Sequence, residues 1–82
     1  GADSVLQVAD AVLARDSANV IANVARAQAL ETLGRRLPAA TQWARVYAVH
    51  GDSIPVGIIA VEGLLRMGQA QESLDNARAL LR

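Results

Sequence analysis

Few side chains of this 82-residue chain could do chemistry, and they are not grouped in a catalytic pattern. His50 is the one histidine, and there is no cysteine. A single histidine does not make the usual zinc site, and without thiols there is no thiolate nucleophile. His50, Asp52 and Ser53 are the residue types of a catalytic triad, but one short turn lacks the separate elements that orient such a triad. We therefore predict no catalytic residue, no metal site and no cofactor, and we interpret His50 as a helix-end residue.

The remaining polar residues also have structural interpretations. Capping or close packing explains the serines at helix starts, turns and small-residue positions, which are Ser4, Ser17, Ser53 and Ser73. Glu62 and Arg66 are four residues apart and predict a solvated ion pair on one helix. Trp43 and Tyr47 lie one helical turn apart, so we expect them first in the core and second as an exposed binding anchor. The glycines occur singly, which predicts no phosphate-binding loop.

The charge balance restricts the kind of partner. Eight acidic residues balance eight basic ones, and every basic residue is arginine. Nucleic acids and anionic membranes attract clustered positive charge, so neither is expected as the main partner. The longest apolar stretch, "IPVGIIAV", is far shorter than the roughly 20 residues that span a bilayer, so no membrane insertion is predicted for this segment. Because the chain starts with Gly1, we expect a fragment of a larger protein.

Apolar residues recur at helical spacing along the whole chain, which predicts an all-α fold. We expect five antiparallel helices, over about residues 3–15, 19–33, 38–49, 54–67 and 69–82. Leu80 and Leu81 of the fifth helix are expected to point inward. The fourth helix is apolar on nearly every side, and such a helix is usually buried on every side. We therefore expect Ile58, Leu65 and their neighbours to contact a partner, a further repeat or a second copy of the chain.

The sequence is self-similar when it is shifted onto itself by the separation of two glycines. The shift that aligns Gly34 with Gly68 also aligns Leu30 with Leu64, and predicted helix starts and ends coincide as well. We call this displacement the repeat shift. A helix–turn–helix unit of this length predicts one domain over residues 1–82, in which 1–19 are the second helix of a partial repeat, 20–53 a full repeat and 54–82 a nearly complete one. We interpret the two glycines as the same turn in successive repeats.

Two segments resemble the tetratricopeptide repeat family. "GQAQESLDNARALL" (Gly68 to Leu81) is similar to its turn and second helix, and "VLARDSAN" (Val12 to Asn19) is similar to its repeat end. The resemblance covers nearly the whole chain and implies a right-handed α-solenoid. The chain departs from the family pattern at the first-helix aromatic, replaced by Asn23 and Gly57, and at the repeat-ending proline.

The resemblance implies a non-enzymatic scaffold that binds a protein or peptide partner. The first helices of such repeats line a groove for a peptide or partner helix, and here they offer Ile21, Val24, Gln28, Glu31, Thr32, Pro55, Ile58, Glu62, Leu65 and Arg66. These residues lack the lysine, arginine and asparagine set with which chaperone-binding members hold a terminal carboxylate, so a co-chaperone role is rejected. The mixed to apolar groove suits an amphipathic helix or an apolar-anchored segment.

A structural role is the alternative. The end helices lack their capping partners, which predicts self-association or use as a spacer or dimerisation segment without a peptide ligand. Similar arrays occur in bacterial secretion and envelope-assembly proteins, so the resemblance is compatible with cytoplasm or periplasm. The partner and the parent protein stay open at this point.

Overall fold

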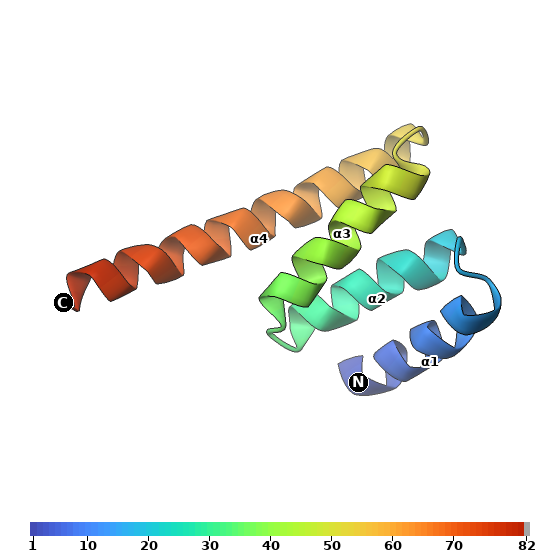
Figure 1. Ribbon diagram of the computed structural model, residues 1–82, viewed down its shortest axis with the longest axis horizontal. Helices are drawn as coiled ribbons and strands as arrows, with labels where there is room; N and C mark the ends of the chain where they lie inside the picture. Colours follow the sequence, from blue (N-terminus) through green and yellow to red (C-terminus); the bar gives the residue numbers. More distant parts are fainter. Residues whose placement is uncertain (82) are drawn as a thin grey trace.

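The computed structural model describes residues 1–81 and confirms the all-α fold (Figure 1). These residues form four helices, α1 (Ala2–Arg15), α2 (Val20–Thr32), α3 (Arg36–His50) and α4 (Ile54–Leu80). Successive helices run antiparallel and each packs on its neighbour in chain order. The result is an elongated stack of 47 × 28 × 16 Å rather than a closed bundle.

Short-range signals determine the turn between α2 and α3. Gly34 adopts a φ of 73°, and the amide of Arg35 donates to the carbonyl of Leu30 at 2.9 Å while that of Gly34 donates to the carbonyl of Glu31 at 3.0 Å. This pair of bonds is the Schellman arrangement that closes many helices at a glycine. Pro38 then lies in the first turn of α3, where its missing amide costs little.

The predicted fifth helix is wrong, because α4 continues without a break through Gly68 to Leu80. The repeat shift shows why: Pro38 stands four positions after Gly34, whereas Glu72 stands at the matching place after Gly68. A proline there would remove a helical hydrogen bond and clash with the carbonyl four positions earlier, but glutamate favours the helix. The helix therefore tolerates Gly68 at a cost of about 1 kcal/mol.

The straight α4 also exposes residues that were expected inside. Arg36 at the start of α3 donates from Nε to Gln71 Oε1 at 3.2 Å, and α4 runs on past this point (Figure 1). Leu80 and Leu81 are 86% and 87% exposed, so the prediction that they point inward is wrong.

Trp43 lies at the centre of a core built mainly from small side chains. It is fully buried, which confirms the core prediction, whereas Tyr47 is half exposed. The ring of Trp43 packs against the backbone of α4, since a Cβ placed on Gly63 would lie 2.6 Å from Trp43 Nε1. The close approach of α3 and α4 therefore depends on a residue without a side chain. The buried cluster around Trp43 comprises Ala27, Leu30, Ala39, Val46, Ala60 and Met67.

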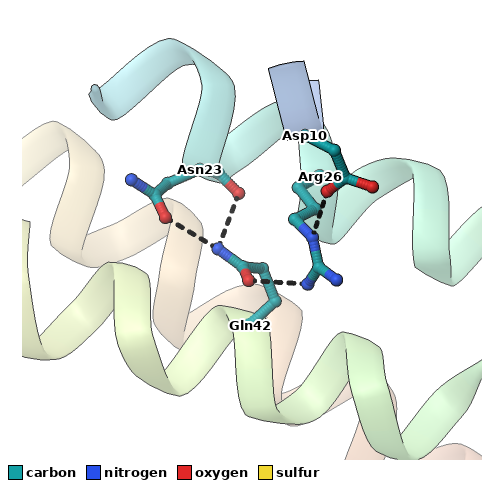
Figure 2. Close-up of polar contacts among 4 residues, drawn as sticks. All are labelled: Asp10, Asn23, Arg26 and Gln42. Carbon is teal, nitrogen blue, oxygen red and sulfur yellow. Dashed lines mark hydrogen bonds and ion pairs between the residues drawn. The ribbon is translucent and has the colours of Figure 1, made fainter. Parts of the chain in front are cut away.

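A chain of polar contacts ties the first three helices together (Figure 2). Gln42 of α3 donates from Nε2 to Asn23 Oδ1 of α2 at 2.8 Å, and its Oε1 accepts from Arg26 Nη1 at 2.9 Å. Arg26 Nε in turn donates to Asp10 of α1 at 2.8 Å. Within residues 1–81, Asn23 and Gln42 are the two buried polar residues, and their mutual bonds meet the requirement that such groups be paired.

Candidate functional site

The predicted groove residues lie on α2 and on the first half of α4. On α2, Ile21 is 78% exposed, Gln28 and Thr32 are exposed, and Val24 and Glu31 are partly buried. All five predicted residues of α4 are exposed, namely Pro55, Ile58, Glu62, Leu65 and Arg66. Exposure alone does not place these residues in one site, so the side of the helix on which each residue lies must also be compared.

The structure divides these residues between two sides of α4. Ile21, Val24 and Gln28 line a shallow hollow of about 330 Å³ together with Val56 of α4. Ile58 is about 200° from Val56 around the helix, at 3.6 residues per turn. It lines a second hollow on the other side of α4, beside Tyr47 of α3.

The other members follow the same division. Glu62 lines the hollow of Ile58 and Tyr47, and Leu65 lines a third hollow with Val61 and Glu72. Arg66 turns toward α2 instead. One continuous groove therefore does not collect all ten residues.

Glu31 and Arg66 are brought together from two helices. Arg66 Nε donates to Glu31 Oε2 at 2.9 Å and Arg66 Nη2 donates to Glu31 Oε1 at 3.2 Å, so the expected pair with Glu62 is replaced by one with α2. Trp43 Nε1 also donates to Glu31, at 2.9 Å. The bonds from Arg66 and Trp43 lower the pKa of Glu31, and the bond to Glu31 raises the pKa of Arg66. Both carboxylate oxygens of Glu31 already accept hydrogen bonds, so this carboxylate joins helices and is not placed to bind a ligand.

A larger apolar surface lies between α1 and α2, and of its residues only Ile21 was among the predicted site residues. We call it the α1–α2 groove; its volume is about 490 Å³, and it is lined by Ser4, Val5, Val8, Ala9, Val12, Asn19, Ile21, Ala22 and Ala25. None of these side chains is charged. Val5 and Val8 are 45% and 65% exposed although they belong to the apolar stripe of their helix. Ile21 lines both this groove and the hollow beside Val56, so the two surfaces are continuous.

The repeat shift explains the chemistry of this groove. Val5, Val8, Ala9 and Val12 correspond to four residues of α3, which are Ala39, Gln42, Trp43 and Val46. All four of those residues are buried, and two of them hydrogen-bond to α2. The same helix face that holds α2 on α3 is therefore left without a helix on α1. The signal was present in the sequence, since the repeat shift relates the two faces.

Within residues 1–81, no three His, Cys, Asp or Glu side chains gather where they could hold a metal ion. His50 ends α3, with Nε2 enclosed and without a hydrogen-bond partner among the described residues, and its carbonyl accepts from the amide of Ser53 at 3.0 Å. No described helix has the length and apolar character needed to cross a membrane. Comparison of the chain with models of protein families, with curated proteins and with solved structures gave no match.

Proposed function

We propose that this chain is a tetratricopeptide-like scaffold that binds an amphipathic helix of a partner protein in the α1–α2 groove. One observation carries the proposal: α1 presents the face with which α3 holds α2, and on α1 Val5 and Val8 of that face are exposed. The bound helix would then lie as α2 lies on α3. In this interpretation the stack is a short piece of right-handed solenoid, and the chain acts by binding, without catalysis.

The lining of the groove indicates the chemistry of the partner. Val5, Val8 and Ile21 offer aliphatic contacts, and no charged lining side chain could anchor a carboxylate or phosphate. Burial of exposed apolar area supplies the favourable free energy at about 25 cal/mol per Å². The partner helix should therefore carry small and aliphatic residues on one face, as helices bound in apolar grooves do. Ile21, Val24 and Gln28 of the predicted set continue the surface toward α4.

A substitution in the groove tests this proposal. An array of helical peptides with aliphatic faces is probed with the wild-type chain, with Val8→Asp and with Val49→Asp. Val49 is a matched control, because it is also a half-exposed helical valine, on α3 and outside the groove. Peptide binding should be lost in Val8→Asp and kept in Val49→Asp, with equal helix content by circular dichroism. Equal binding by both variants would contradict the proposal.

The alternative function is that of a dimerisation segment. A different apolar surface, on α4 and outside the α1–α2 groove, favours this alternative.

A further inference from the structure

A second apolar surface follows α4 on the side away from α2. Ile54, Ile58, Val61 and Leu65 recur at the spacing of one helix face, and we call them the α4 stripe. Their exposures are 75%, 53%, 42% and 60%. Two hollows of about 310 and 440 Å³ lie along the stripe, with Tyr47 and Gly51 at one end and Gly68 and Glu72 at the other.

The repeat shift identifies what this surface is shaped to hold. The residues of α2 that hold α3 are Asn23, Ala27, Leu30 and Glu31, and the matching residues of α4 are Gly57, Val61, Leu64 and Leu65. Arg45 of α3 also donates to the carbonyl of Ser17, and the match of Ser17 is Gly51, which lines the hollow beside Tyr47. Val61 and Leu65 belong to the α4 stripe, which therefore overlaps the surface equivalent to the one on which α3 lies, whereas Gly57 is buried and Leu64 packs on the core.

The segment equivalent to α3 is residues 69–81. Buried Ala39, Trp43 and Val46 correspond to Ser73, Ala77 and Leu80. The volumes of the facing side chains compensate each other. In one repeat a small Ala27 faces a large Trp43, and in the next the larger Val61 corresponds to Ala27 and the small Ala77 to Trp43. A close-packed interface needs such compensation of volume.

This segment cannot reach the stripe of its own chain while α4 is straight. The contact between Glu31 and Trp43 corresponds to one between Leu65 and Ala77. These two residues are twelve positions apart on one continuous helix, which is about 18 Å at 1.5 Å per residue. The α4 stripe and the segment that is equivalent to α3 are thus both present in one chain, but they do not contact each other.

We infer that residues 69–81 of a second copy occupy the α4 stripe, and that the exchange is reciprocal. The stripe of one α4 then lies antiparallel to residues 69–81 of the other, and the pairs equivalent to the α2–α3 contacts are centred near Gly68. Because Ser73, Ala77 and Leu80 lie roughly 100° around a straight helix from the stripe, residues 69–81 turn about Gly68 to make this contact. Apart from its own turn of α4, no described atom lies within 4 Å of the place where a Cβ on Gly68 would stand, so two backbones can approach closely there. The contact is two-fold symmetric and satisfies both stripes at once, as in domain-swapped dimers.

Engineered disulfides test the exchange, because the chain has no cysteine of its own. Chains with Leu65→Cys alone are mixed with chains of different mass with Ala77→Cys alone, refolded together and oxidised. A mixed covalent dimer is expected. The control mixture replaces Leu65→Cys with Gln28→Cys, which places the thiol on α2 away from the stripe, and should give no more than background crosslinking. Mixed crosslinking at that background level overturns the inference.

A single chain with both Leu65→Cys and Ala77→Cys distinguishes exchange from closure. Exchange gives a disulfide-linked dimer, whereas an intrachain disulfide in a monomer overturns the inference, since it means that α4 folds back on itself. Leu80→Ser with Leu81→Ser should weaken the dimer by about tenfold or more in sedimentation, because both leucines are almost wholly exposed in the single chain. Unchanged dimer affinity contradicts the exchange. Val8→Asp should leave the dimer intact, so this result is independent of partner binding in the α1–α2 groove.

Discussion

Arg66 of α4 donates two hydrogen bonds to Glu31 of α2, at 2.9 and 3.2 Å. Trp43 of α3 donates a third to the same carboxylate at 2.9 Å, and the Arg66 guanidinium lies 6.0 Å from the centre of the Trp43 ring. One carboxylate thus joins three helices in a stack that otherwise packs in chain order. Bonds to a charged acceptor are stronger than neutral ones.

This contact predicts a pH-dependent stability. The pKa of Glu31 is lower in the folded chain than its ordinary value of 4.5, because the ionised form accepts bonds from Arg66 and Trp43. Its contribution is therefore complete above pH 4.5 and is lost as the pH falls through the lowered folded value. Glu31→Gln should cost about 0.5–1 kcal/mol of unfolding free energy at pH 7 and progressively less in acid.

Urea unfolding between pH 7 and pH 3 measures this difference. Glu72→Gln is the control, because Glu72 is exposed and makes no ion pair within residues 1–81. A Glu31→Gln deficit that stays constant across this range would contradict the assigned role of the carboxylate.

The two glycines that the repeat shift aligns should respond oppositely to alanine. Gly34 has φ of 73°, where an alanine costs roughly 1–2 kcal/mol. Gly68 lies inside α4 with open space where a Cβ would stand, so Gly68→Ala should stabilise the helix by about 1 kcal/mol. Thermal unfolding of both variants at low concentration measures the two signs. Destabilisation of similar size by both would mean that Gly68 is a turn after all.

The same glycines show which parts of the fold follow from the sequence and which do not. Helical spacing predicted the first four helix starts, and Asn19 caps α2 as its type favours, with Oδ1 accepting from the amide of Ala22 at 2.9 Å. The repeat period is a property of the sequence, but it does not require the same turn twice. Whether the helix ends is determined four positions after each glycine, by Pro38 in the first repeat and by Glu72 in the second. At Glu72 the local helix preference outweighs the repeat.

The sequence predicts only some residues of the candidate site. Ile21, Val24 and Gln28 do share one surface, because they lie on one face of one helix. The family pattern predicts Ile58 and Leu65 in the same groove, but they line hollows on the side of α4 opposite Val56. Val5 and Val8 are not among the predicted site residues, because an apolar stripe predicts burial without saying what covers it.

Asn23 is buried in α2, and its contacts predict a structural cost for its removal. Its Nδ2 donates to the carbonyls of Ser17 at 3.1 Å and Asn19 at 2.8 Å, while its Oδ1 accepts from Gln42. Asn23→Ala would leave buried groups without partners and should destabilise the chain by about 1–3 kcal/mol. Chemical denaturation measures this cost. Asn76→Ala is the control, since Asn76 is exposed on α4 and should change stability by less than about 0.5 kcal/mol.

Glu72→Pro should turn the second repeat into a copy of the first. A proline at this position disfavours a continuous α4 by about 3 kcal/mol, and it suits the place after Gly68 as well as Pro38 suits the place after Gly34. Residues 69–81 would then fold back on the α4 stripe of their own chain. In the chain with Leu65→Cys and Ala77→Cys, the disulfide should change from interchain to intrachain, and sedimentation should show a monomer. Glu72→Ala keeps a helix former at the same place and should keep the interchain bond. An interchain disulfide that persists in Glu72→Pro would show that the missing proline does not decide between the straight and the folded-back helix.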